Sequence, residues 1–149
     1  LPLGYMQFHT HPQPFEIIQA PDRLVILYEA SAGVREVFLD GRALLPLGEP
    51  IPTWYGYSVG HWEDDTLVVT SNNFRGDGWL DFNGSPTTEK LVITERFRRV
   101  SYGKIELDIT IDDPGAYTEI FNLRADFTIM PGDNLIEWVC DSENSSQYF

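Results

Sequence analysis

The segment Lys104-Ile105-Glu106-Leu107-Asp108-Ile109-Thr110-Ile111-Asp112 alternates strictly between apolar and polar residues. A period of two places the aliphatic side chains on one face of a β-strand and the polar side chains on the other. The same pattern recurs in residues 123–129, and residues 23–28 and 66–70 are aliphatic and β-branched runs typical of buried strands. We find no segment with the periodicity of an amphipathic helix. The sequence therefore predicts an all-β protein.

Short turn sequences separate the strand-like runs. Asp113-Pro114-Gly115 and Pro131-Gly132-Asp133 are examples, and such sequences favour hairpins between antiparallel strands. The predicted strands lie near residues 15–20, 23–31, 34–40, 55–63, 66–74, 88–100, 103–112, 116–130 and 134–141. A sheet left open would present two unpaired edges, so we expect an antiparallel up-and-down β-barrel of about 8–10 strands. A two-sheet β-sandwich is the alternative.

The 149 residues suffice for one domain, which is predicted to comprise residues 15–149. Residues 1–14 are rich in proline and are predicted to form an extended arm. The arm would pack along the domain or on a neighbouring subunit, and the second arrangement would give a homo-oligomer. Two long connections, at residues 41–53 and 75–87, are candidates for functional loops.

Composition narrows the range of functions. The 23 acidic and 10 basic residues give a formal net charge of −13, which argues against nucleic acids and anionic membrane surfaces as partners. No apolar run approaches the roughly 20 residues of a membrane-spanning helix, so membrane insertion is not expected. The sequence begins with leucine rather than methionine. Removal of an export signal would explain this, and a secreted or periplasmic location is expected.

Several segments carry a resemblance that extends over nearly the whole chain. They are residues 52–69 (PTWYGYSVGHWEDDTLVV), 79–81 (WLD), 94–99 (TERFRR), 110–114 (TIDDP) and 116–118 (AYT), with Cys140, Glu143 and Asn144 near the end. In these segments the chain resembles a group of short exported bacterial proteins without an assigned activity. The resemblance implies export in a bacterium and a lipocalin-like barrel, and it transfers no catalytic residue. Such proteins often have a histidine where this chain has Tyr57.

Glu95 is the most informative candidate for chemistry. It alternates with Leu91, Ile93 and Phe97, so it shares their face of the strand. If that face is the barrel interior, burial would raise the pKa of the carboxyl group, as a general acid or base requires. The alternative is that Glu95 accepts hydrogen bonds from an interior arginine, tyrosine or tryptophan and orders the core.

His61 and Asp81 are the proposed companions of Glu95. His61 shares a face with Tyr57 and points into the cavity if that face is buried, but it points to solvent if the Trp62 face is buried instead. Asp81 lies on the second long connection and could either reach a ligand or form a turn. In an enzyme, Glu95 would be the acid or base, His61 its partner, and Asp81 or Tyr57 an orienting group.

No cofactor or metal site is predicted. His9-x-His11 and the oxygen-rich loop 72–78 are weak metal signals, because too few further ligands have a recognisable spacing. The expected function is binding of a small hydrophobic or aromatic ligand in an enclosed cavity, and the expected ligand-binding residues are Trp54, Tyr55, Trp79, Phe82, Phe97 and Tyr117. The alternative is a cofactor-free isomerase, lyase, cyclase or hydrolase that uses Glu95, His61 and Asp81.

Overall fold

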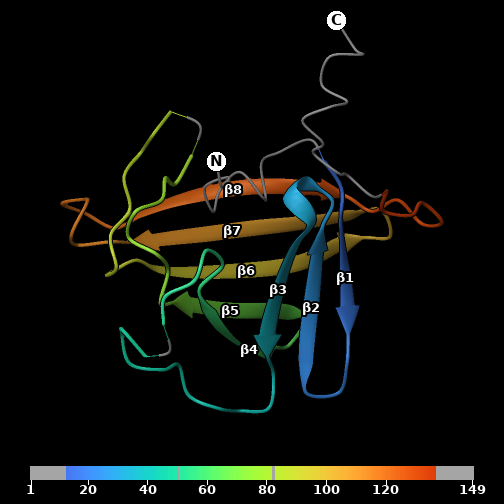
Figure 1. The fold of residues 1–149 in the computed structure, drawn as a ribbon. Helices are drawn as coiled ribbons and strands as arrows, with labels where there is room; N and C mark the ends of the chain where they lie inside the picture. Colours follow the sequence, from blue (N-terminus) through green and yellow to red (C-terminus); the bar gives the residue numbers. More distant parts are fainter. Residues whose placement is uncertain (1–12, 50, 82, 137–149) are drawn as a thin grey trace, which may run out of the picture.

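Eight strands form a single sheet in the computed structural model, which describes residues 13–49, 51–81 and 83–136 (Figure 1). The strands are β1 (Phe15–Gln19), β2 (Arg23–Tyr28), β3 (Gly33–Phe38), β4 (Tyr57–Glu63), β5 (Thr66–Asn72), β6 (Val92–Ser101), β7 (Lys104–Asp112) and β8 (Phe121–Thr128). One turn of 3-10 helix, η1 (Ala30–Ala32), joins β2 to β3. The prediction of an all-β protein is confirmed.

The contact between β3 and β4 sets the shape of the sheet. These strands are parallel and pair only through Val37 with Ser58 and Phe38 with Val59, whereas the other neighbouring strands are antiparallel. A parallel pair needs a crossover connection, and residues 39–56 supply it. Figure 1 shows the result: β1, β2 and β3 run across β4 to β8 as a second layer.

The prediction of a closed up-and-down barrel is wrong, because the sheet curls into an open half-barrel. Among the described residues, β1 pairs only with β2 and β8 only with β7, so both remain edge strands. The short parallel contact bends the sheet into two facing layers instead of continuing it round a ring. The two edges meet through the rings of Phe15 and Phe127, whose centroids are 5.0 Å apart. The alternative of two separate sheets is not formed either, since all eight strands share one hydrogen-bonded sheet.

Two predicted strands are shortened by turns. The strand expected from residue 88 begins at Val92, because Leu91 N–H donates to the carbonyl of Thr88. The strand expected from residue 116 begins at Phe121, because the carbonyl of Asp113 holds the following residues in a turn. Residues 134–136 of the expected ninth strand are not extended in a sheet, and its remainder lies outside the described residues, as do residues 1–12 of the arm.

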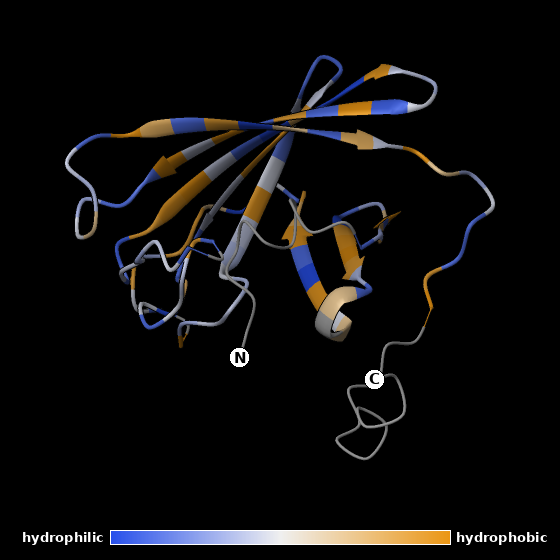
Figure 2. Cartoon of the chain, turned by 90° about the horizontal axis from the view of Figure 1, so that it is seen from above, coloured by the Kyte–Doolittle hydropathy of each residue, from blue (hydrophilic) through white to orange (hydrophobic). Residues whose placement is uncertain are grey.

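The core lies between the two layers and follows the alternation of the sequence. Figure 2 shows hydrophobic and hydrophilic residues succeeding one another along the strands. The fully buried apolar side chains come from both layers and include Leu24, Ile26, Val37, Val69, Leu91, Ile93, Leu107, Ile109 and Ile111. Burial of each such side chain contributes about 1.5–3 kcal/mol. Aliphatic side chains from both layers therefore pack in the interior that was expected to hold a ligand.

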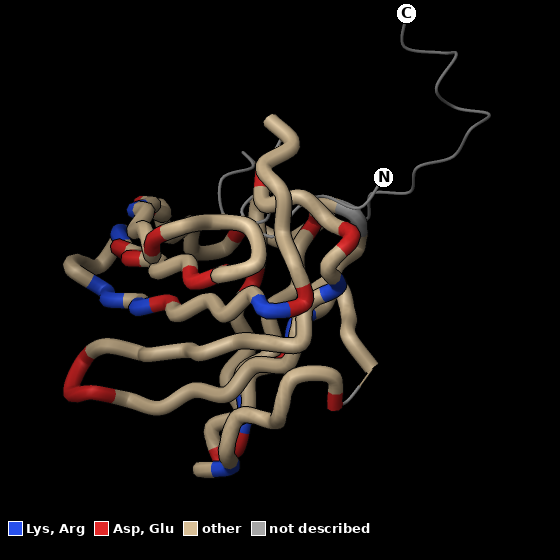
Figure 3. The backbone as a smooth tube through the Cα atoms, turned by 90° about the vertical axis from the view of Figure 1, so that its left-hand side faces the viewer, with Lys and Arg blue, Asp and Glu red and all other residues tan. Residues whose placement is uncertain are grey.

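Opposite charges on nearby strands of β4 to β8 form ion pairs, and Figure 3 shows where acidic and basic residues lie along the chain. Glu63 on β4 pairs with Arg96 on β6, and Glu106 on β7 accepts from Arg98 on β6 and Arg124 on β8. Cross-strand pairs of this kind stabilise a sheet modestly. They also pair three of the ten basic residues of this acidic chain within the fold.

Candidate functional site

A buried ion pair joins the two layers of the half-barrel. Arg35 on β3 is 1% exposed and Glu95 on β6 is 0% exposed. Arg35 Nη1 donates to Glu95 Oε1 at 3.0 Å, and Nη2 donates to Oε2, so the contact is bidentate. Glu95 thus lies on the buried face, as its alternation with Leu91, Ile93 and Phe97 indicated. The guanidinium offsets the cost of several kcal/mol that an unpaired carboxylate would have there.

Two serines and a tyrosine complete this network. Arg35 Nε donates to Ser58 Oγ at 3.2 Å, Nη2 donates to Ser71 Oγ at 2.8 Å, and the two hydroxyl oxygens are 2.8 Å apart. Burial raises the pKa of Tyr28, which also hydrogen-bonds Arg35. Both oxygens of the Glu95 carboxylate accept from the guanidinium. The structure therefore corresponds to the alternative interpretation of Glu95, in which it accepts hydrogen bonds from an interior arginine.

His61 lies on the opposite face of the sheet from Glu95. The buried face of β4 is the one that carries Ser58 and Gly60, since a β-carbon at Gly60 would lie 3.1 Å from Val37 Cγ1. The His61 side chain is 63% exposed, and its Nε2 is 3.1 Å from Glu63 Oε1. Arg96, and then His61, lower the pKa of Glu63. The structure therefore does not bring His61 and Glu95 together as an acid–base pair.

Replacing His61 is accordingly expected to leave the fold almost unchanged. His61→Ala should alter the free energy of unfolding by no more than about 0.5 kcal/mol in urea denaturation, because the side chain is exposed. Ser58→Ala on the same strand is the matched comparison. It removes an acceptor from the buried Arg35 and should cost about 1–3 kcal/mol. Equal effects of the two variants would contradict the assignment of the strand's faces.

Asp81 forms a turn within its own loop. Its Oδ1 accepts from the backbone N–H groups of Asn83 and Ser85, and its Oδ2 accepts from Ser85 Oγ at 2.8 Å. Burial raises the pKa of Asp81, but these hydrogen bonds outweigh that effect and bring the pKa below its usual range. Asp81 therefore has the turn-forming role that was the alternative to a ligand contact, and it does not join His61 or Glu95 in one constellation.

The predicted ligand-binding residues differ in their burial and contacts. Phe97 is buried in the core. The Tyr55 ring stacks on the Tyr28 ring, with the two centroids 5.8 Å apart, and burial raises the pKa of Tyr55 to about 12. Tyr117 donates to the carbonyl of Pro86 at 2.9 Å. The remaining ones are Trp54 and Trp79, both exposed, and Phe82, which lies outside the described residues. The proposed orienting residue, Tyr57, packs on the Phe38 ring at 5.5 Å.

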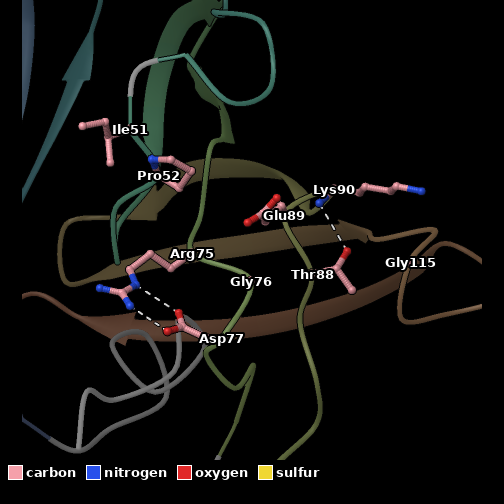
Figure 4. Close-up of a pocket in the computed structure, with 9 residues that line it drawn as sticks. All are labelled: Ile51, Pro52, Arg75, Gly76, Asp77, Thr88, Glu89, Lys90 and Gly115. Carbon is pink, nitrogen blue, oxygen red and sulfur yellow. Dashed lines mark hydrogen bonds and ion pairs between the residues drawn. The ribbon is translucent and has the colours of Figure 1, made fainter.

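An open hollow of about 800 Å³ lies where the two long connections meet the ends of the strands (Figure 4). Its lining comes from four separate parts of the chain: Ile51 and Pro52; Arg75, Gly76 and Asp77; Thr88, Glu89 and Lys90; and Gly115. The volume is within the range of small-molecule sites. Both long connections, which the sequence marks as candidates for functional loops, contribute residues to this lining.

A flat cationic group borders the hollow. The Arg75 guanidinium lies 4.3 Å from the ring centroid of Trp54, which is a cation–π distance. Arg75 Nε and Nη2 also donate to the two carboxylate oxygens of Asp77, at 3.0 and 2.6 Å. This guanidinium holds the pKa of Asp77 below its usual range. Trp54, Arg75 and Asp77 therefore form one ordered group at the edge of the hollow.

Asp113 fixes the other side of the hollow. Its carboxylate accepts from Thr88 N–H at 2.7 Å, from Thr88 Oγ1 at 2.5 Å and from Gly115 N–H at 3.1 Å. A β-carbon at Gly115 would lie 2.4 Å from Thr88 Oγ1, so the two segments touch closely. Asp113 is 2% exposed and was not among the residues singled out from the sequence. The Asp-Asp-Pro turn that contains it was the available signal.

Asn72 and Asn73 hold the crossover connection against the end of β5. Asn72 Nδ2 donates to the carbonyl of Leu45 at 2.7 Å. Asn73 Nδ2 donates to the carbonyls of Pro46 and Glu49, and Asn73 Oδ1 accepts from Gly48 N–H at 2.6 Å. These amides were considered only as part of a weak calcium signal. In the structure they bind backbone groups, and Asp77 of the same loop binds Arg75.

In the part of the chain that the structure describes, no three histidine, cysteine or acidic side chains are close enough together to hold a metal ion. His9 and His11 lie outside that part. Within residues 13–49, 51–81 and 83–136, no helix has the length and apolar character needed to cross a bilayer.

Comparison with known proteins adds no assignment, since no family model, curated protein or solved structure matches this chain. The resemblance to exported bacterial proteins stays a prediction. The function must therefore be inferred from the geometry of the site.

Proposed function

We propose that this protein binds a small molecule, with an apolar or aromatic part, in the hollow between residues 51–52, 75–77, 88–90 and 115. The single observation that carries the proposal is the convergence of these four segments, distant in sequence, around about 800 Å³ of open space. The class of ligand is the one expected from the sequence. The location differs, since the hollow is lined by residues outside the buried core between the layers.

An apolar wall supports the choice of ligand. Ile51 is 85% exposed and stands beside Pro52 on the hollow. An exposed isoleucine next to a concave surface gains contact area when a ligand covers it, at about 25 cal/mol per Å² of apolar surface. Trp54 lies next to this wall and carries Arg75 on its ring. A planar or alicyclic group of a ligand would contact the apolar carbon of Ile51 and Pro52 on one side and the charged lining residues on the other.

The support of the hollow also favours a binding function. Asn73 holds the crossover connection, and Asp113 holds Thr88 and Gly115. Both residues are buried. Asp113 binds two residues that line the hollow, and Asn73 binds residues 46, 48 and 49, which precede the lining residues Ile51 and Pro52. A site whose walls are held by buried hydrogen bonds loses little conformational entropy when a ligand binds.

The proposal is tested by mapping the binding of a panel of small aromatic and alicyclic compounds in ¹⁵N–¹H correlation spectra. Shifts are expected at the amides of Gly76, Glu89 and Gly115 and at the Trp54 indole. Ile51→Ser should weaken binding by about 1 kcal/mol, about fivefold in Kd, because it removes apolar contact area.

Ile120→Ser is the matched control, since Ile120 is 59% exposed and does not line the hollow. It should leave the Kd unchanged. Shifts concentrated elsewhere in the protein, an absence of saturable binding across the panel, or equal effects of the two substitutions would contradict the proposal.

A further inference from the structure

We infer that the hollow selects an organic cation, with the Glu89 carboxylate as its counter-ion and the wall of Ile51 and Pro52 receiving its hydrocarbon part. This inference rests on the proposed function and adds the chemical class of the ligand.

Glu89 is placed in the hollow by its packing on Gly76. A β-carbon at Gly76 would lie 2.9 Å from Glu89 Cγ and 2.7 Å from Glu89 N, so the glutamate side chain occupies space that only glycine leaves open. In Figure 4 the carboxylate of Glu89 points towards the side of Pro52 and Arg75. The acidic group therefore lies over the hollow and not outside it.

The other charges leave Glu89 unbalanced. Arg75 and Asp77 neutralise each other through two hydrogen bonds, and the Asp77 carboxylate stays ionised. The ammonium group of Lys90 points away from the hollow in Figure 4. Among the described residues, no basic nitrogen lies within 4.0 Å of the Glu89 carboxylate, in contrast to the ion-paired Glu63 and Glu106. Of the two lining charges outside the Arg75–Asp77 pair, the Glu89 carboxylate is therefore the one directed over the hollow.

A cation with a hydrocarbon part satisfies both sides of the hollow. Its charge meets Glu89, and its carbon skeleton covers Ile51, which water otherwise contacts. The formal net charge of −13 adds a long-range attraction for cations and a repulsion for anions. An anion of the same shape would be repelled by Glu89, and the guanidinium of Arg75 is already bound to Asp77.

Three probes of similar shape and different charge test the inference: 2-phenylethylammonium, 2-phenylethanol and 3-phenylpropanoate. Each probe is titrated into the protein and followed in ¹⁵N–¹H spectra. The titrations are done at about 0.15 M salt, which screens the effect of distant charges. The ammonium probe should bind about fivefold more tightly than the alcohol, as expected for one ion pair near water, and the carboxylate probe more weakly than the alcohol.

Glu89→Gln should remove this preference. Glu16→Gln is the matched control, because Glu16 is an exposed residue on β1 and its substitution changes the net charge by the same amount. It should retain the fivefold preference. If the preference survives in Glu89→Gln, the net charge of the protein causes it and the inference is overturned. If all three probes bind the hollow equally, the inference fails while the proposed function stands. If none binds there, both fail.

Discussion

Replacing Glu95 by alanine is expected to lower the free energy of unfolding by about 3–5 kcal/mol, the largest effect of any single substitution considered for this chain. The substitution leaves the Arg35 guanidinium, which is 1% exposed, without its counter-charge between the two layers. A buried charge without a partner costs several kcal/mol, and Ser58 and Ser71 supply only neutral acceptors. Urea denaturation followed by circular dichroism measures the loss.

The double variant Arg35→Met with Glu95→Met separates two contributions to the free energy of unfolding. One is the cost of leaving the Arg35 charge unpaired, and the other is the net contribution of the ion pair. It removes both charges and should recover most of the stability, because apolar replacements of a buried pair are often neutral or better. Glu36→Ala breaks the exposed pair with Arg23 and should have little effect. A loss of less than about 1 kcal/mol in Glu95→Ala would contradict the buried pairing.

Replacing Asn73 by alanine is expected to cost about 2–4 kcal/mol and to release the crossover connection. The Asn73 amide binds the backbone of residues 46, 48 and 49, and the residue has a φ of 57°, a conformation that asparagine tolerates better than alanine. Removing the side chain therefore leaves backbone groups without partners and also strains the main chain.

Two measurements test the role of Asn73. Urea denaturation gives the loss of stability, and limited proteolysis of the folded protein should cut the variant within residues 41–52 faster than the wild type. Asn134→Ala is the control, since Asn134 is exposed, and it should change the stability by no more than about 0.5 kcal/mol. Unchanged proteolysis in Asn73→Ala would show that other contacts hold the connection.

Part of the buried network was predictable. Alternation with apolar neighbours places Glu95 inward, and the same argument places Arg35 on the face of Val37. The pairing of these two charges could not be predicted, because they are 60 residues apart and meet only where β3 crosses β6. A charged residue at a buried position indicates that a partner exists but does not identify it.

The orientation of His61 shows a different limit. Alternation divides β4 into two faces but does not say which face is buried. Contacts from other strands decide this: Gly60 lies against Val37, and Ser58 binds Arg35. The side chain of Trp62 shares that face and still remains exposed near the end of the strand, so its size was no guide.

The amino-acid sequence by itself determined that the chain forms strands, near which residues they lie and that Glu95 shares a face with Leu91, Ile93 and Phe97, because a period of two is a local property of the extended backbone. Only the tertiary structure decided that the sheet stays open, that His61 faces solvent and that four segments line an open hollow. The physical reason is the crossover at residues 39–56, which joins β3 and β4 in parallel over two residue pairs. Hydrogen bonds from Asn72 and Asn73 hold it, and their partners lie 24–27 residues away along the chain.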